Sequence, residues 1–256
     1  MNGNNSSWGR GKHLHLINSE KKSCSNCDGE KLCLAFGLDE TAICDFKSVI
    51  KERGPFSPGD TIYRQQDQFK ALYSIQSGSV KTETVTADGR QSVMGFYLTG
   101  DLFGVDGIGG NTYPSDAIAI EKTWVCEIPY AELLKLCSGE PTLQQKFINR
   151  LGNKIHADEY SGKVVRNESA SRRVMHFLYQ LYWHQAREKS ASLRLHLPMS
   201  KQDLASFLGL TPESFSRTLT QLQKQGHIIK ESHKILVLEK APESAESSSI
   251  ELLDIR

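Results

Sequence analysis

The sequence predicts an α+β protein in which an antiparallel β-domain is joined by one long helix to a smaller C-terminal domain of helices and a hairpin. Three observations support this prediction. Short apolar runs separated by turn residues fill the region from about residue 59 to residue 129. An apolar stripe with helical spacing follows from about residue 142, and two capped helical stretches lie beyond residue 199.

The length and composition of the chain limit the classes of protein to which it can belong. The chain has 256 residues, of which 38% are hydrophobic and 24% charged, and this is enough for two modest cores. No apolar run approaches the roughly 18 residues that span a bilayer. Residues 1–20 are rich in Asn, Ser and Gly and lack the apolar segment of a signal peptide. We therefore expect a disordered N-terminus over residues 1–20 and a cytoplasmic protein.

A cysteine loop and a short helix are predicted for residues 21–50. Cys24, Cys27 and Cys33 follow one another closely in a polar stretch. Three close thiolates suit a metal site that takes its fourth ligand from elsewhere in the fold, and either zinc or an iron–sulfur cluster binds four thiolates. Spacing alone leaves the fourth ligand open among the three other cysteines, Cys44, Cys126 and Cys137. For Cys44 and Cys137 we favour the role of small buried apolar residues. The short helix is expected over residues 38–50, ended by Gly54-Pro55.

Residues 51–140 are predicted to form the β-domain, as an antiparallel sandwich or roll. Turn signals such as Ser77-Gly78 and Asp88-Gly89 separate its apolar runs. The expected strands are residues 61–63, 71–75, 80–85, 93–98, 118–120 and 124–128, and a helix is expected over residues 130–139. Cys126 should therefore lie on a strand.

The long helix over residues 141–168 has the pattern of a coiled-coil seam. Ile148, Leu151 and Ile155 recur at alternating steps of three and four residues, and Asp158 occupies the next seam position. A core helix lying on the β-domain is the alternative, but the polar residue in the stripe favours dimerisation. Two Asp158 carboxylates about 5 Å apart would repel by about 3 kcal/mol at an effective dielectric of about 20. Burying one Ile or Leu contributes roughly 1.5–3 kcal/mol, so we expect a seam near balance between monomer and dimer.

Residues 169–240 are predicted to form a helix-turn-helix domain with a hairpin wing, followed by a flexible tail over residues 241–256. The pattern comprises a helix cap at Ser200-x-x-Asp203, a buried face of Leu204, Ala205 and Leu208, a turn at Gly209 and a second helix start at Thr211-Pro212. Glu213, Ser216 and Arg217 would then face outward on the first turns of the second helix. These residue types read base edges in the major groove.

The charge distribution agrees with contact to nucleic acid. Residues 163–234 hold 12 Lys+Arg and 5 Asp+Glu, a net charge of +7, whereas the remainder of the chain has a net charge of −6. A basic region attracts phosphate backbones. We therefore predict that the C-terminal domain binds double-stranded DNA.

Together these residues resemble the Crp/Fnr superfamily of bacterial regulators, and most of all its oxygen-responsive fumarate–nitrate reduction regulators. The resemblance covers residues 24–238. It rests on the cysteine spacing, Gly100-Asp101-Leu102 with Gly104, Val125-Cys126-Glu127-Ile128-Pro129 and Glu213-Ser214-Phe215-Ser216-Arg217. It implies a β-roll of the cyclic-nucleotide-binding type, a dimerisation helix and a winged helix-turn-helix.

The resemblance also implies a 4Fe–4S cluster held by Cys24, Cys27, Cys33 and Cys126. An intact cluster would favour a homodimer that binds palindromic DNA with TTGAT-type half-sites at genes of anaerobic metabolism, and oxygen would degrade the cluster and dissociate the dimer. RNA polymerase is an implied partner, with the hairpin of residues 82–89 as one candidate surface. Relatives that bind cyclic AMP have an Arg-Ser pair where this chain reads Thr112-Tyr113-Pro114-Ser115, so no cyclic nucleotide is expected.

Two other classes of protein are alternatives to an oxygen-responsive regulator. One is a regulator of the same fold that senses another ligand or zinc, and the other is an iron–sulfur redox enzyme. The sequence has no phosphate-binding loop, no Gly-x-Ser-x-Gly and no His-Glu-x-x-His. We therefore predict that the protein is not an enzyme.

Overall fold

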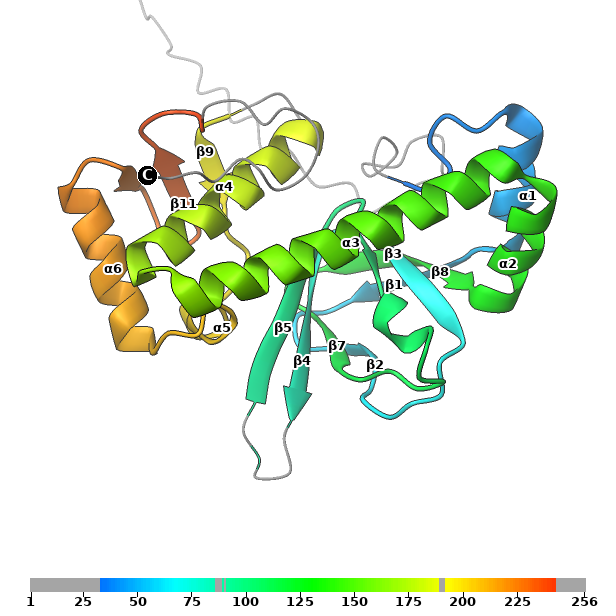
Figure 1. Ribbon diagram of the computed structural model, residues 1–256, viewed down its shortest axis with the longest axis horizontal. Coiled ribbons are helices and arrows are strands. Elements are labelled where there is room, and N and C mark those ends of the chain that lie inside the picture. Colours follow the sequence, from blue (N-terminus) through cyan, green and yellow to red (C-terminus); the bar gives the residue numbers. More distant parts are fainter. Residues whose placement is uncertain (1–32, 86–88, 90, 189–191, 243–256) are drawn as a thin grey trace, which may run out of the picture.

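The computed structural model describes residues 33–85, 89, 91–188 and 192–242. Within these residues, two four-stranded antiparallel sheets form the N-terminal β-roll, with strand orders β1-β8-β3-β6 and β2-β7-β4-β5 (Figure 1). The strands are β1 Lys51–Phe56, β2 Thr61–Tyr63, β3 Ala71–Ser77, β4 Ser79–Val85, β5 Gln91–Leu98, β6 Leu102–Phe103, β7 Asp116–Ala119 and β8 Thr123–Pro129. The six strands expected from the sequence are confirmed, with ends that shift by at most two residues.

Two strands of the roll were not expected. The sequence placed a helix end at Gly54-Pro55, but these residues lie inside β1, which pairs with β8 at the sheet edge. Proline is tolerated there because an edge strand leaves some of its N–H groups unpaired. Strand β6 has only two residues and is defined by its pairing with Tyr73 and Ser74 of β3.

Aromatic rings fill the space between the two sheets. Tyr63 stacks on Tyr113 with ring centroids 3.8 Å apart, and Phe103 lies 5.4 Å from Tyr73 and 5.5 Å from Tyr97. All five residues are at least nine-tenths buried. The interior of the roll is therefore packed with side chains of this chain.

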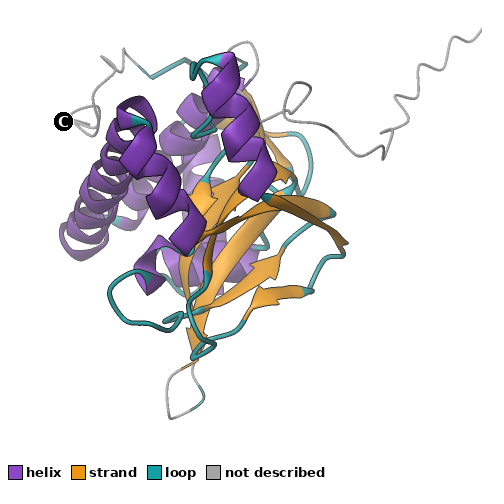
Figure 2. Ribbon diagram, turned by 90° about the vertical axis from the view of Figure 1, so that its right-hand side faces the viewer, coloured by secondary structure: helices purple, strands orange, loops and turns teal. Residues whose placement is uncertain are grey.

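A second core joins the front of the chain to the roll. Leu34, before α1 (Glu40–Val49), and Phe46, on α1, belong to this core. They pack with Ile128 of β8, Leu133 of α2 (Tyr130–Gly139) and Phe147 of α3 (Pro141–Asn167). A short 3-10 turn, η3 (Val105–Gly107), lies beside this core. Figure 2 shows the helices gathered along one side of the strands.

Helix α3 (Pro141–Asn167) runs along the molecule from the roll to the C-terminal domain (Figure 1). It is buried near its ends, at Leu143, Phe147 and Val164. Its middle is open, since Ile148 is 52% and Ile155 58% exposed. Among the helices of the described residues, none is long and apolar enough to cross a membrane.

The C-terminal domain surrounds a third core. It consists of α4 (Ala170–Glu188), β9 (Arg194–His196), α5 (Lys201–Phe207), α6 (Pro212–Lys224), β10 (Ile228–Lys230) and β11 (Ile235–Leu238), with sheet order β10-β11-β9. The expected helices and hairpin are confirmed, and β9 is an addition that makes the wing three-stranded. Leu178, Leu195, Leu222 and Ile228 are fully buried in this core.

One buried histidine makes the joint between α3 and α4 sensitive to pH. His176 of α4 is 5% exposed, stacks on the Tyr160 ring of α3 at 5.2 Å, and has no hydrogen-bond partner for Nε2 among the described residues. Burial lowers the pKa of His176 from 6.5 to about 4. Between these two values the unfolded chain binds the proton and the folded one does not, so stability falls as the pH drops from 6.5 to 4.

We expect His176→Phe to remove this pH dependence. A pKa difference of that size corresponds to roughly 3 kcal/mol of unfolding free energy, which is present in full above pH 6.5 and is lost progressively as the pH falls to about 4. Urea unfolding at pH 7 and pH 4.5 measures the effect. His233→Phe, at an exposed histidine in the wing, is the control that should keep the wild-type slope. An unchanged slope in His176→Phe would contradict the assignment.

Candidate functional site

Helix α6 begins with a local cap and presents one face to solvent. Thr211 Oγ1 accepts a hydrogen bond from the Ser214 amide at 3.1 Å, and Pro212 occupies the first turn. Phe215, Thr218 and Leu222 are buried against the domain core. The helix is therefore fixed in rotation, and its opposite face is free to contact a partner.

The residues predicted to read DNA lie on that open face. Glu213 and Arg217 are exposed and Ser216 is half-buried. A hydrogen bond from its own backbone amide, followed by one from Thr211, lowers the pKa of Glu213, so the carboxylate is ionised at neutral pH. An ionised carboxylate accepts hydrogen bonds, for example from cytosine N4, and Arg217 can donate two to guanine.

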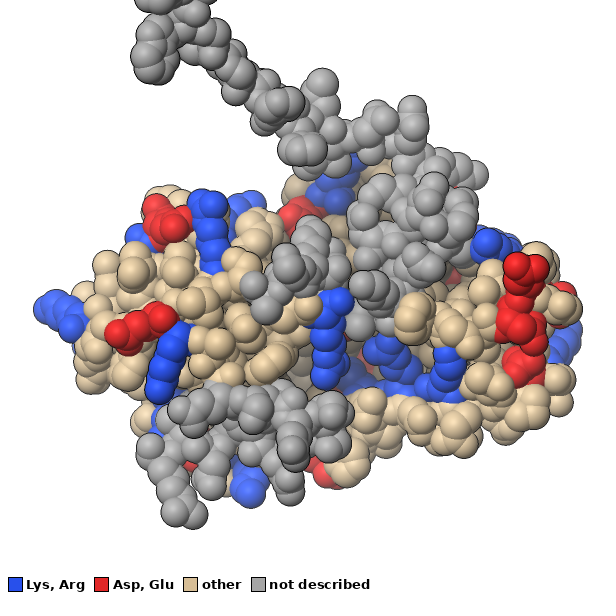
Figure 3. All heavy atoms as spheres, turned by 90° about the horizontal axis from the view of Figure 1, so that it is seen from above, with Lys and Arg blue, Asp and Glu red and all other residues tan. Residues whose placement is uncertain are grey.

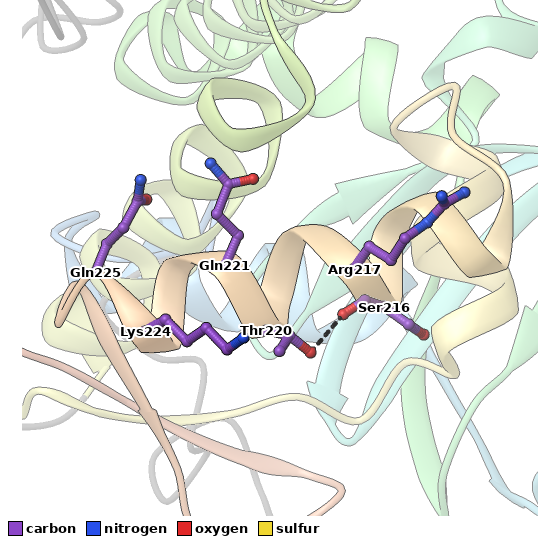
Figure 4. Close-up of a pocket in the computed structure, with 6 residues that line it drawn as sticks. All are labelled: Ser216, Arg217, Thr220, Gln221, Lys224 and Gln225. Carbon is purple, nitrogen blue, oxygen red and sulfur yellow. Dashed lines mark hydrogen bonds between the residues drawn. The ribbon is translucent and has the colours of Figure 1, made fainter.

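The open face continues beyond the three predicted residues. Figure 4 shows two rows of side chains along α6, one of Arg217, Gln221 and Gln225 and one of Ser216, Thr220 and Lys224. The six residues line an open hollow of about 500 Å³. The residues predicted from the sequence to contact DNA end at Arg217 and do not include Thr220, Gln221, Lys224 and Gln225. Their spacing of four residues along one helix is the signal that identifies them.

The turn between α5 and α6 lies close to α3 and is hydrogen-bonded to α4. Gly209 has φ +62°, and a Cβ there would lie 3.1 Å from Val165 Cγ1 of α3. The Arg173 guanidinium of α4 donates to the carbonyls of Leu208 and Gly209 at 3.2 and 3.3 Å. Glycine is required because the turn has a left-handed residue close to a neighbouring helix.

Charged side chains of both signs cover the surface. Seen from above (Figure 3), Lys and Arg are spread over both halves of the molecule, and a group of Asp and Glu lies at the right-hand end, where Figure 1 places α1 and α2. Other Asp and Glu side chains lie in the left half, where Figure 1 places the C-terminal domain.

The predicted metal ligands are only partly within the described residues. Cys24 and Cys27 lie outside them. Cys33 is half-buried just before α1, and Cys126 is half-buried on β8, opposite Glu52 of β1 and Ser74 of β3. Cys33 packs against the core that includes Ile128, two residues further along β8. Cys33 thus packs against a core to which the strand of Cys126 contributes Ile128.

Cys33 also lies in a cationic environment. Burial raises the pKa of the Cys33 thiol, while backbone hydrogen bonds and the charges of Arg150 and Lys146 on α3 act in the opposite direction. Lys146 donates a hydrogen bond to the Phe36 carbonyl and lies 5.9 Å from the centre of the Phe36 ring. Positive side chains beside a thiolate donor fit a site whose four ligands are anionic sulfurs, so the described residues fit a thiolate-bound group.

The two additional cysteines differ from one another. Cys137 of α2 is buried in the second core, where burial raises its thiol pKa, as expected for a small apolar residue. Cys44 is exposed on α1, so the expectation that it is a buried residue is wrong. The helix turns its apolar face, with Ala42 and Phe46, toward the roll and leaves position 44 outside.

The seam residues of α3 lie along an open stripe, and Asp158 is paired with a lysine one helical turn before it. Ile148, Ile155 and Asp158 are exposed, and Leu151 is half-buried. Lys154 donates to the two carboxylate oxygens of Asp158 at 2.5 and 2.7 Å. Lys154 also lies 5.5 Å above the Tyr97 ring of β5, which holds it against the roll.

The stretch that replaces the Arg-Ser pair enters the aromatic core of the roll. Tyr113 donates its hydroxyl to the Ala71 carbonyl at 2.7 Å and stacks on Tyr63, and Ser115 is 2% exposed. These tyrosine side chains are part of the buried core of the roll. An Arg for a phosphate group is absent from residues 112–115.

The fold and the open helix α6 define a class: a transcription regulator with a roll of the cyclic-nucleotide-binding type and a helix-turn-helix that binds DNA. Residues 53–140 match the family model "Cyclic nucleotide-binding domain", and residues 172–241 match "Crp-like helix-turn-helix domain". The chain belongs to the Crp/Fnr superfamily. It is 34% identical over 203 residues to the fumarate and nitrate reduction regulatory proteins of Escherichia coli K12 and Shigella dysenteriae, covering 79% of this chain and 81% of each relative.

Solved structures agree with this placement. FixK2 from Bradyrhizobium japonicum is 26% identical, with a TM-score of 0.68 over 75% of this chain and 94% of that chain. A CooA mutant from Carboxydothermus hydrogenoformans is 16% identical, with a TM-score of 0.62 over 76% of this chain and 85% of that chain. The second likeness supports the fold alone.

Arg217→Ala is expected to weaken operator binding and relax sequence preference. Loss of a bidentate contact to one base pair costs about 1–3 kcal/mol, mostly in discrimination against the wrong base. Fluorescence anisotropy with matched and substituted half-sites measures both quantities. Lys201→Ala, at an exposed basic residue that starts α5, is the control and should weaken binding to all sequences by the same factor. If Arg217→Ala keeps wild-type discrimination, Arg217 does not read a base.

Proposed function

We propose that this protein is an oxygen-responsive transcription regulator in which a 4Fe–4S cluster on Cys24, Cys27, Cys33 and Cys126 favours a homodimer that binds palindromic DNA and controls genes of anaerobic metabolism. Loss of the cluster in oxygen returns the protein to the monomer. When bound, such a cluster supplies an oxygen-labile centre joined to four thiolates. The relatives whose names refer to fumarate and nitrate reduction support this proposal.

The observation that carries the proposal is the direct attachment of the cysteine segment to α3. Lys146 of α3 donates a hydrogen bond to the Phe36 carbonyl, three residues beyond Cys33. Lys146 and Arg150 alternate along α3 with Ile148 and Leu151 of the seam. Any displacement of the segment around Cys33 therefore changes side chains on the same two turns as the seam. Because Ile148 and Ile155 are exposed in one chain, a second copy of α3 is a fitting partner for them.

On DNA, each protomer would place α6 in the major groove of one half-site. Glu213, Ser216 and Arg217 would contact the base edges of a TTGAT-type sequence, and Thr220, Gln221 and Lys224 would extend the contact along the helix. A symmetric dimer requires two such half-sites related by a two-fold axis. RNA polymerase is the proposed protein partner, with the hairpin of residues 82–89, partly outside the described residues, as a candidate surface.

The roll is proposed to work without a cyclic nucleotide. The rings of Tyr63, Tyr73 and Tyr113 pack in its interior, and Tyr97 connects this packing to Lys154 of α3. In this arrangement the roll transmits the state of the cysteine site through its packing. The protein would be cytoplasmic, where thiolates stay reduced.

Anaerobic purification tests the proposal. We expect a brown protein with about four iron and four sulfide per chain, dimeric by sedimentation and bound to a TTGAT palindrome. Exposure to air should bleach it, yield monomers and release the DNA. A colourless protein that contains zinc and keeps its oligomeric state in air would show a different sensor of the same fold, and steady turnover of a substrate would show an enzyme.

A further inference from the structure

The DNA-reading domain is docked on its own roll through a group of buried charges. Lys81 of β4 lies between Asp203 of α5 and Glu83 of its own strand, at 2.8 Å from a carboxylate oxygen of each. The three side chains are 17%, 19% and 9% exposed. Burial by itself lowers the pKa of Lys81, but the hydrogen bonds and charges of Asp203 and Glu83 outweigh it and raise the pKa, so the lysine is charged.

A β-bulge beside this lysine provides a second contact. Thr82 pairs with Gly95 and Glu83 pairs with Val93, so Met94 is an extra residue in β5. The Val93 amide turns outward and donates to Ser206 Oγ of α5 at 3.1 Å. Strand β5 is at the edge of its sheet, where some N–H groups face away from the neighbouring strand, and here one of them meets the first helix of the helix-turn-helix.

Aromatic packing and a histidine complete the contact. Phe96 of β5 meets Phe207 of α5 at 5.2 Å and Phe177 of α4 at 6.1 Å. His184 Nε2 of α4 lies 3.1 Å from Asp101 Oδ1, in the turn that follows β5. Figure 1 shows α5 beside β5 on the side of the roll that faces the C-terminal domain.

We propose that Lys81 is a positioning residue for DNA recognition: by holding α5 on the roll it sets the direction of α6 and so the distance between half-sites that the protein accepts. Helix α5 packs against α6 in one core that includes Leu204, Phe215 and Leu222, so the two helices move together. The joint between α3 and α4 is short, with only Glu168 and Ser169 between the two helices, and the contact through Lys81 gives the domain a second point of attachment on the roll. Recognition of a palindrome needs both reading helices at one fixed separation.

Replacing Lys81 tests this assignment. In Lys81→Met, Glu83 and Asp203 face one another without the cation, and an unpaired buried charge disfavours the docked arrangement. We expect the preference for the matched operator over one with an extra central base pair to fall by about tenfold. Lys81→Arg keeps the charge and should keep most of the preference. Lys135→Met, at an exposed lysine of α2, is the matched control and should behave as wild type.

Hydrogen exchange gives a readout that needs neither cluster nor dimer. The Val93 amide and the α5 amides should exchange faster, by about tenfold, in Lys81→Met and in Ser206→Ala than in the wild type. The measurement of operator spacing rests on the proposed dimeric function, whereas the hydrogen-exchange measurement does not. A failure of the proposed function can therefore be distinguished from a failure of the role assigned to Lys81. If Lys81→Met keeps both the wild-type spacing preference and the wild-type exchange at Val93, the proposal is wrong.

Discussion

Cys126→Ser is expected to lose its iron and, with it, anaerobic occupancy of the operator. Serine offers a poor ligand where the proposed site needs a thiolate, and β8 is the element that would join the cysteine segment to the roll. A monomer binds one half-site, so affinity for the palindrome should fall by roughly 10²-fold or more. Iron and sulfide analysis and anisotropy under nitrogen measure the two effects.

The roll itself should survive this substitution. Cys126 is half-buried, and its β-sheet partners Glu52 and Ser74 already provide a polar neighbourhood for a hydroxyl. A change of one atom at such a position costs no more than about 1 kcal/mol of stability. An unchanged thermal transition of the cluster-free protein in air would show that the lost binding is not a folding defect.

Cys44→Ser is the matched control. Cys44 is exposed on α1 and supplies the same chemical change at the same end of the molecule. It should keep wild-type iron content and DNA affinity. The ligand assignment would be refuted if Cys126→Ser kept its iron and its anaerobic occupancy, or if Cys44→Ser lost both.

Most of the secondary structure could be predicted because its signals are local. The caps at Ser200 and Thr211 and the turn at Gly209 specify α5 and α6 within a few residues, and all three act as expected. Strands β1, β6 and β9 escaped prediction because they are short or contain a turn signal. Each exists through its pairing with a longer strand, namely β8, β3 and β11.

The candidate site was predicted as far as it depends on spacing along one element. The positions of Glu213, Ser216 and Arg217 follow from the period of α6. The pair of Lys154 and Asp158 has the i,i+4 spacing of one helix and was open to the same kind of prediction. The position of Lys154 over Tyr97 of β5 and the pairing of Asp203 with Lys81 of β4 could not be predicted in this way, because they join residues that are remote in the chain. Metal ligation by Cys24, Cys27, Cys33 and Cys126 stays a prediction, and the first two of these cysteines lie outside the described residues.

Asp158→Ala is expected to give a dimer that persists in air. Removing the carboxylate abolishes the repulsion between two protomers across the seam. The pairing with Lys154 offsets part of that repulsion already, so the gain is smaller than the value of about 3 kcal/mol for two bare carboxylates. We expect the dimer dissociation constant in air to fall by about 10- to 100-fold, as measured by analytical sedimentation.

Lys154→Met is expected to act in the opposite direction. Lys154 is 29% exposed and Asp158 61% exposed, so the lysine is the more fixed member of the pair. Burial lowers the pKa of Lys154, but the charges and hydrogen bonds of Tyr97 and Asp158 outweigh it and raise the pKa, which keeps the lysine protonated. Without it, Asp158 presents an unopposed charge to the partner, and the anaerobic dimer should weaken.

A control variant separates the loss of the Asp158 charge from the change in side-chain shape. Asp158→Asn keeps the side-chain volume and removes the charge, so it should resemble Asp158→Ala in air. High salt should reduce the difference between Lys154→Met and the wild type, since the Debye length shrinks to about 3 Å at 1 M. The seam is wrongly assigned if Asp158→Ala sediments as a monomer in air. The role of Lys154 is wrongly assigned if Lys154→Met strengthens the dimer, because a counter-ion cannot then be what Asp158 needs.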